Sequence, residues 1–254
     1  MVRLPPNMRC GTLAVLEQAL ISGAAVGLAT YAVRGKSSSL LAPSIYHGDR
    51  TRPSLALTFD DGPSESTPAL LELLAEYDVK ATFFMCGTNV RRLNSIAREV
   101  AAAGHEIGNH TDSHSAFYFK SPEFVYRELA LAQETIHKVT RASPRFFRAP
   151  YGVRWPGLRR AQNRLNLTGV MWTAIGRDWK WPSSRISRLL LSRAAGGAIF
   201  CLHDGRELRR SPDIRATLDA VEFALPILKE RGFSFETVSQ ITSFSEIPSR
   251  EILR

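Results

Sequence analysis

Two adjacent carboxylates, Asp60 and Asp61, end an apolar run and are followed at once by a Gly-Pro pair. Further along, His110 and His114 are four residues apart, so both imidazoles can face one point from a helical turn or a tight loop. With one carboxylate they make a His₂Asp set, which suits Zn²⁺ and leaves positions open for water and substrate. The other carboxylate is then free to take a proton as a general base. Taken alone, the histidine pair is also compatible with two incidental histidines on a helix face.

These residues need a scaffold, and the pattern from Ser54 onward supplies one. Short runs rich in β-branched and aromatic residues alternate with segments of helical periodicity. The predicted strands are Leu55–Phe59, Ala81–Met85, His105–Asn109, Arg145–Arg148, Leu167–Thr173, Ala198–Leu202 and Phe233–Val238. Thr67-Pro68 and Ser121-Pro122 each predict a helix start, because an N-cap residue precedes a proline. About seven such repeats indicate an α/β fold with a mostly parallel sheet and outer helices, either a barrel or an open doubly wound sheet.

The polar residues fall at the carboxyl ends of the predicted strands. In barrels and open α/β sheets this face gathers ligand-binding and catalytic groups, because its loops vary over a rigid scaffold. The residues placed there are Asp60, Asp61, His110, His114, Arg148, Asp178 and His203. We therefore expect one site assembled from five strand ends.

Five short motifs, in this order, resemble those of the polysaccharide deacetylase family, the NodB-homology domain of carbohydrate esterase family 4. They are TFDDGP (Thr58–Pro63), HTDSH (His110–His114), RAPY (Arg148–Tyr151), DW (Asp178–Trp179) and LHD (Leu202–Asp204). The resemblance runs from Ser54 to about Gln240 and implies a distorted (β/α) barrel of about seven parallel strands. It also implies a metal-dependent hydrolase of non-peptide carbon-nitrogen bonds. Its substrate would be the N-acetylglucosamine units of peptidoglycan or a chitin-like oligosaccharide.

The resemblance assigns roles to the residues at the strand ends. It implies that Asp60 is the general base, while Asp61, His110 and His114 hold a divalent metal, most often zinc, with cobalt, manganese or nickel as alternatives. His203 would protonate the departing amine.

A second set would support these groups. The resemblance implies that Arg148 orients Asp60, that Asp178 holds Arg148, and that the backbone N–H of Tyr151 stabilises the oxyanion. An ordinary buried ion pair is the alternative for Arg148 and Asp178.

Four more residues are assigned to substrate binding. Trp172 and Trp179 would line the site, with plain core packing as the alternative. The fifth motif reads Cys201-Leu202-His203, whereas the family has leucine two residues before the histidine. Residue 201 shares the His203 face of its strand, so Cys201 would line the acetyl-methyl pocket. The alternative is that Cys201 is simply a small buried residue. Leu202 is also assigned to substrate binding. A second departure is Ile175, where the family often has aspartate.

Composition bounds the partners. The 254 residues include 44% hydrophobic residues and carry a net charge of +9. This charge is compatible with anionic neighbours such as cell-wall polymers, lipid headgroups or nucleic acid, and also with an ordinary solvated basic surface. No nucleic-acid motif is present, so we expect no nucleic-acid partner. Cys10, Cys86 and Cys201 lack the spacing of a disulfide framework or a cysteine-based zinc site.

The N-terminus predicts a separate segment. Its uncharged run, Gln18 to Val33, is slightly shorter than the roughly 17–25 residues that span a bilayer. A membrane anchor, a signal peptide and a helix packed on the domain are all compatible with it. The predicted organisation is a hydrophobic segment over 1–36, a linker over 37–53, the catalytic domain over 54–243 and a tail over 244–254. The expected location is the cell envelope, either anchored or secreted.

Two other functions stay open at the level of sequence. A non-catalytic glycan-binding or scaffold protein could share the fold, because a protein can keep its fold after it has lost its activity. A hydrolase of another small amide or imide would use the same metal centre in a closed pocket.

Overall fold

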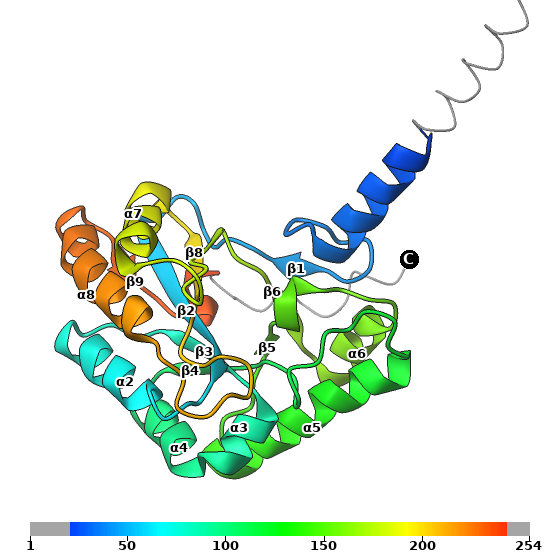
Figure 1. The fold of residues 1–254 in the computed structure, drawn as a ribbon, viewed down its shortest axis with the longest axis horizontal. Helices are drawn as coiled ribbons and strands as arrows, with labels where there is room; N and C mark the ends of the chain where they lie inside the picture. The colour runs from blue at the N-terminus through cyan, green and yellow to red at the C-terminus, as the bar shows by residue number, and fades with distance from the viewer. Residues whose placement is uncertain (1–20, 243–254) are drawn as a thin grey trace, which may run out of the picture.

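Residues 21–242 are described by a computed structural model, shown in Figure 1. Its strands are β1 Ser44–Ile45, β2 Ser54–Gly62, β3 Thr82–Met85, β4 Glu106–Asn109, β5 Phe146–Phe147, β6 Thr168–Val170, β7 Ala174–Ile175, β8 Ala198–His203 and β9 Ser234–Phe235. Its helices are α2 Thr67–Glu76, α3 Gly87–Arg92, α4 Asn94–Ala102, α5 Pro122–Thr140, α6 Leu158–Leu165, α7 Ser183–Arg193, α8 Arg215–Glu230, α9 Val238–Ile241 and the 3-10 turn η1 Pro150–Gly152. Each of the seven predicted strands is present, and β1 and β7 are additional.

The described strands form one nine-stranded sheet in the order β1-β6-β5-β4-β3-β2-β8-β7, with β9 against β2. All of its strand pairs are parallel. Only residues 171–173 separate β6 from β7, although the two strands lie toward opposite ends of this order. The sheet must therefore curl until its ends approach each other. No ladder joins β1 to β7 in the described part, so the expected barrel is confirmed in an open, distorted form.

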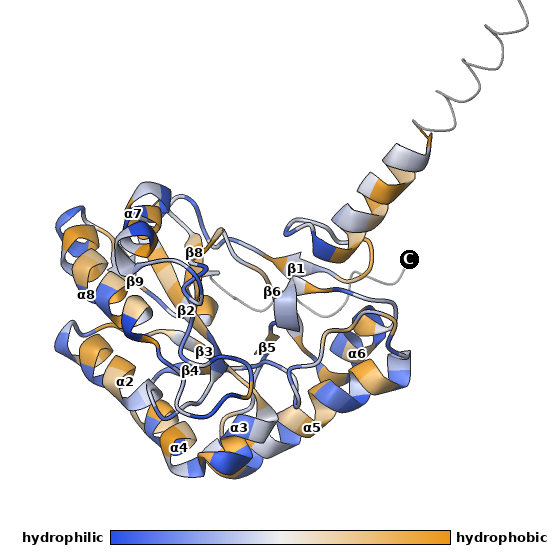
Figure 2. Ribbon diagram, in the orientation of Figure 1, coloured by the Kyte–Doolittle hydropathy of each residue, from blue (hydrophilic) through white to orange (hydrophobic). Residues whose placement is uncertain are grey.

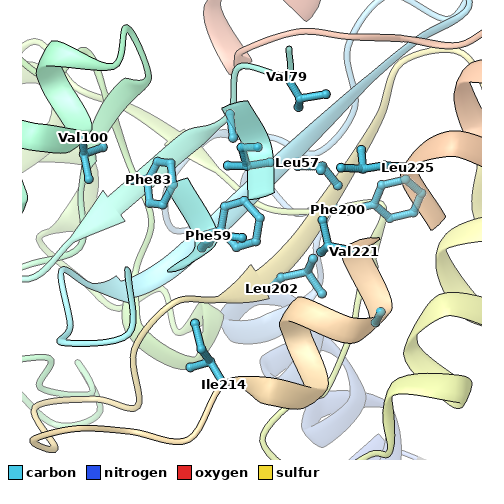
Figure 3. Close-up of a cluster of buried hydrophobic side chains, with 14 of the residues drawn as sticks. Leu57, Phe59, Val79, Phe83, Val100, Phe200, Leu202, Ile214, Val221 and Leu225 are labelled. Atoms are coloured by element: carbon cyan, nitrogen blue, oxygen red, sulfur yellow. The ribbon is translucent and has the colours of Figure 1, made fainter. Parts of the chain in front are cut away.

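The main core lies between the sheet and its outer helices. The central strand β2 is buried along its whole length, as a parallel strand covered on both faces should be. Alternate residues of the central strands, among them Leu57, Phe59, Phe83 and Phe200, share one core cluster with Val221 and Leu225 of α8 (Figure 3).

The helix starts follow the predicted signals closely. Ser121 caps α5 as expected, and its hydroxyl accepts a hydrogen bond from the Phe124 N–H. At α2 the cap is Ser66 rather than Thr67, and the predicted proline occupies the first turn.

The segment before β2 differs from a linker. Within the predicted 37–53 stretch, β1 pairs with β6 and Ala42 is fully buried. The expected C-terminal tail, 244–254, and the first twenty residues of the 1–36 segment lie outside the described residues.

Residues 21–34 form a helix that projects away from the barrel (Figure 1), and Figure 2 colours part of it as hydrophobic. Ile21, Val26 and Leu28 are 62%, 66% and 61% exposed, so this part of the helix does not pack on the domain. Only near its end does Val33 join the cluster beneath α5 and α6. Among the described helices, none is both long enough and apolar enough to cross a bilayer.

Candidate active site

A cleft of about 960 Å³ opens at the carboxyl ends of the strands. Its lining includes nine of the twelve sequence-predicted site residues, namely Asp60, Asp61, His110, His114, Tyr151, Trp172, Trp179, Cys201 and His203. The structure thus brings together residues at the ends of six strands, β2, β4, β5, β6, β7 and β8, at the edge where the parallel arrangement predicts one site.

Asp60 and Asp61 both line this cleft, although neighbouring residues of a regular strand point to opposite faces. The register between β2 and β3 shifts between Asp60 and Gly62, and Asp61 has a φ of 73°. This irregularity turns the second carboxylate toward the same side as the first. Gly62 is needed at the next position, because a Cβ there would collide with the Asp204 carboxylate.

That buried aspartate, Asp204, contacts the turn that follows Gly62. No role was assigned to it from the sequence. The Thr67 hydroxyl donates a hydrogen bond to its Oδ2 at 2.6 Å, and the Ser64 hydroxyl donates to its backbone oxygen at 2.5 Å. Burial raises the pKa of Asp204 to about 7, against the lowering effect of the Thr67 hydrogen bond. Its place in the LHD motif was the available signal.

Asp61, His110 and His114 form the candidate metal centre. Asp61 Oδ1 lies 3.2 Å from His110 Nε2 and 2.9 Å from His114 Nε2. The pair of histidines sits on a loop rather than a helix, with Thr111 and His114 at positive φ. All three side chains are buried, and their ligand atoms lie within 4.8 Å of one another.

The hydrogen bonds around this centre fit a bound cation. His110 Nδ1 lies 2.7 Å from the backbone oxygen of Arg148, a pure acceptor, so Nδ1 carries the proton. A neutral His110 then turns its Nε2 lone pair toward Asp61 Oδ1, and that oxygen has no hydrogen-bond donor. Two lone-pair-bearing atoms that face each other in a buried place, with no proton between them, are suited to bind one divalent cation together.

Asp61 is also ionised, as a ligand must be. Burial alone would raise its pKa, but the neighbouring imidazoles of His110 and His114 hold the pKa well below its usual range. Its other oxygen, Oδ2, accepts the backbone N–H of Glu207 at 2.7 Å.

Asp60 has different partners. Arg148 Nη1 donates to Asp60 Oδ1 at 2.6 Å and to the Thr58 hydroxyl at 2.7 Å. The Cys201 thiol lies 3.4 Å from Asp60 Oδ2. Arg148 is fully buried, and the backbone oxygens of Val170 and Met171 accept hydrogen bonds from its Nε and Nη2. Its fixed guanidinium therefore orients the Asp60 carboxylate, as expected.

Asp178 requires a correction, because it contacts His203 and not Arg148. Asp178 Oδ1 lies 2.8 Å from His203 Nδ1, and Oδ2 accepts both the His203 backbone N–H and the Thr217 hydroxyl. Six strand ends converge on the cleft, and the order of residues along the chain does not specify which of their side chains are in contact. Burial would lower the pKa of His203, but the Asp178 charge and hydrogen bond raise it to about 9.

The aromatic residues frame the reacting centre. Tyr151 has a φ of 57° and donates its hydroxyl to Glu207 at 2.8 Å, while its ring meets His114 edge-on. Burial first, and then Glu207, raises the pKa of Tyr151 to about 12. Trp179 is 50% exposed and packs edge-on against His203, which leaves much of its indole open to the cleft. Trp172 lies beside the Arg148 guanidinium.

Leu202 requires a second correction. It is fully buried in the main core with α8 (Figure 3) and does not line the cleft. Side chains alternate along β8, so Cys201 and His203 face the cleft while Leu202 faces the helices. Ile175 also lines the cleft.

The cleft mouth contains residues that the motifs did not indicate. They belong to the loop after β8 and to the end of the N-terminal helix, and include Arg34, Arg206, Glu207, Arg209 and Arg210. The only sequence signal was the density of arginine after the fifth motif.

Comparison with known proteins defines the class. Residues 47–170 match the polysaccharide deacetylase family model. A chitooligosaccharide deacetylase of Azorhizobium caulinodans is 36% identical over 198 residues, which cover 74% of this chain and 93% of that protein. The chain therefore belongs to the polysaccharide deacetylase family.

Solved structures agree with this assignment. A peptidoglycan N-acetylglucosamine deacetylase has a TM-score of 0.73 and 29% identity, over 78% of this chain and 92% of that one. A family 4 carbohydrate esterase described as a pseudoenzyme, from Bacillus anthracis, has a TM-score of 0.71 and 26% identity, over 80% and 70%. The family thus includes a member whose fold is not accompanied by activity.

Proposed function

We propose that this chain is a metal-dependent deacetylase that removes acetyl groups from N-acetylglucosamine units of an envelope glycan. The observation that carries the proposal is the complete set of groups on one cleft: a His₂Asp centre, a separate carboxylate and a histidine whose Nδ1 contacts the Asp178 carboxylate. Relatives named for chitooligosaccharide and for peptidoglycan N-acetylglucosamine supply the substrate class.

Asp61, His110 and His114 would hold the divalent cation. Two imidazole nitrogens and one carboxylate suit zinc, and cobalt, manganese or nickel accept the same ligands. When bound, such a cation polarises the acetyl carbonyl and lowers the pKa of water.

Asp60 is the proposed base. Its carboxylate lies outside the His₂Asp set and is held by the buried Arg148, so its orientation is fixed before substrate arrives. It accepts the proton of the attacking water.

His203 is the proposed acid. Asp178 takes the Nδ1 side of the ring, which leaves Nε2 to deliver a proton to the departing amine. Asp178 is thus a positioning residue that keeps His203 protonated. The backbone N–H of Tyr151 is the proposed donor to the developing oxyanion.

The open cleft favours a glycan over a small amide. Its volume of about 960 Å³ and its exposed rim, at Trp179 and Arg209, leave room for sugars on either side of the reacting one. A hydrolase of a small imide would need a closed pocket. Cys201 beside Asp60 would line the acetyl-methyl pocket.

The test is acetate release from peptidoglycan, chitooligosaccharide and acetylxylan, with and without a chelator. We expect release from at least one N-acetylated glycan, loss after chelation and recovery on adding Zn²⁺. Metal analysis should find about one ion per chain, with binding weakened roughly 10-fold or more in His114→Ala. A chain that binds metal but releases no acetate from any glycan would be a pseudoenzyme, like the Bacillus anthracis protein.

A further inference from the structure

Six cationic side chains surround the mouth of the cleft, and we call them the cationic rim: Arg34, Arg177, Lys180, Arg206, Arg209 and Arg210. They come from three separate segments, namely the end of the N-terminal helix, the loop after β7 and the loop after β8. Because segments far apart in the chain contribute like charges to one opening, the charge is a property of the cleft and not of one basic stretch.

Half of the cationic rim is free to bind a ligand. Lys180, Arg209 and Arg210 are exposed, and their side chains have no hydrogen-bond or ion-pair partner among residues 21–242. The other half is partly engaged with neutral groups: Arg34 donates to the Tyr151 backbone oxygen, Arg206 to backbone oxygens, and Arg177 lies over the Trp181 ring.

The acids of the cleft do not cancel this charge. Asp60 is paired with Arg148, and Asp61 belongs to the metal centre. Glu207, whose carboxylate accepts the Tyr151 hydroxyl, opposes only one of the six positive charges, and Asp213 is paired with Arg215, which lies outside the cleft lining. The mouth of the cleft therefore retains a positive potential.

We propose that the cationic rim binds an anionic group, a carboxylate or a phosphate, on the glycan beside the sugar that is deacetylated. This inference rests on the proposed function and narrows its substrate class to acidic N-acetylated glycans, in preference to neutral chitooligosaccharides. Arginine suits this task, because its planar guanidinium binds carboxylate and phosphate through two parallel hydrogen bonds.

Exposed charges attract weakly one at a time, and salt screens them within about 8–10 Å. Several like charges around a cleft with low-dielectric walls act together and raise the local concentration of an anionic ligand by about 10-fold or more. The preference should therefore be expressed mainly in KM and should decline as ionic strength rises.

The test compares matched substrates. One is a tetrasaccharide of alternating N-acetylglucosamine and N-acetylmuramic acid with free carboxylates, and its control is the methyl ester of the same tetrasaccharide. A chitotetraose carrying one phosphate monoester, compared with unmodified chitotetraose, separates phosphate from carboxylate. We expect kcat/KM to be about 10-fold higher for an acidic member than for its neutral partner at low salt.

The variant Arg209→Ala/Arg210→Ala should bring this acidic-to-neutral ratio close to one. Its matched control, Arg127→Ala/Arg160→Ala, removes two exposed arginines from α5 and α6, outside the cleft lining, and should keep the ratio. Equal kcat/KM for both members of both pairs would overturn the proposal, as would an equal change in the control variant.

A binding measurement separates this proposal from the proposed function. Calorimetric titration of the full chain with the acidic tetrasaccharide and with its ester reports the rim even if no acetate is released. If the acid binds more tightly than the ester, and Arg209→Ala/Arg210→Ala weakens this binding, the cationic rim binds the anionic group even in a protein that releases no acetate. Equal affinity for acid and ester contradicts it.

Discussion

At the end of β2, two adjacent carboxylates have separate partners and therefore suit separate tasks. Asp61 faces two imidazoles, whereas Asp60 faces a guanidinium that four further groups hold in place. The same separation applies to the two sides of the cleft: Asp60 has a cation beside it, while His203 has a carboxylate beside it. This opposite pairing suits Asp60 to the role of a base and His203 to the role of an acid.

Replacing Asp60 by Asn should abolish turnover and spare the metal. The amide keeps the shape of the side chain but cannot accept the proton, so we expect kcat to fall by about 10²–10⁴. Acetate release and metal analysis of the same sample measure both quantities, with Asp61→Asn as the comparison that should lose the metal. If Asp60→Asn lost metal and activity together, the two roles would have to be exchanged.

Replacing Asp178 by Asn should move the alkaline limb of the kcat/KM profile to lower pH. A histidine pKa raised to about 9 keeps the acid protonated through neutral pH, and activity should fall as pH rises through that value. Without the carboxylate the pKa of His203 drops, so the same fall should begin at lower pH. Asp219→Asn, on the same helix as Thr217 but exposed, is the control and should not move the limb. An unmoved limb in Asp178→Asn would show that another group sets it.

At this scale the sequence predicted which residues gather, because polar residues after parallel strands share one edge of the sheet. It did not predict every contact. Asp178 was assigned to Arg148, since the order of residues along the chain does not specify which strand ends are neighbours. Leu202 was assigned to substrate, although the alternation that places Cys201 in the cleft turns Leu202 to the core.

At the scale of elements, seven of the nine strands were predicted, and β1 and β7 were not. β1 and β7 have two residues each, too few for a period of two to be visible, whereas the equally short β5 and β9 each contain phenylalanine, which marks a strand in the sequence. β1 belongs to a segment, residues 33–45, that packs on the barrel, and we call this segment the N-terminal strap. Arg154 binds it from below: this buried arginine donates to backbone oxygens of Gly35 and Ser38 and to the Ser44 hydroxyl. Thus the strap carries Arg34 to the cleft as part of the domain.

Replacing Arg154 by Met should loosen the N-terminal strap. It would leave the buried Ser38 oxygen without its donor, which costs about 1–3 kcal/mol of unfolding free energy. Arg159→Met is the matched control: Arg159 binds the strap at Ser39 from an exposed position, and its loss should cost about 0.5 kcal/mol or less. Denaturant unfolding gives the energies, and limited proteolysis within residues 35–43 reports the strap itself. Equal effects of the two variants would contradict the assignment of Arg154 as the main clamp.

At the scale of the whole molecule, a basic catalytic domain is joined to a helix whose apolar residues face solvent. The net charge of +9 on the whole chain would draw the protein to an anionic surface, where each basic group near the headgroups contributes about 1 kcal/mol. The helix over residues 21–34 ends at the cleft mouth, since Arg34 bonds to Tyr151. A membrane that accepted this helix would therefore hold the cleft close to its surface.

The last prediction is that this helix associates the protein with membranes. Ile21, Val26 and Leu28 are more than half exposed, and burying such side chains in lipid is favourable by about 1.5–3 kcal/mol each. Val26→Glu/Leu28→Glu should shift the full chain from the membrane pellet to the soluble fraction, while leaving the strap in place. Leu131→Glu/Phe223→Glu is the matched control, because these exposed apolar residues lie on α5 and α8 of the domain. It should stay with the membrane. If the unsubstituted chain is found in the soluble fraction to the same extent as the Val26→Glu/Leu28→Glu variant, the exposed helix does not bind membranes. The cleft must then meet its glycan in solution.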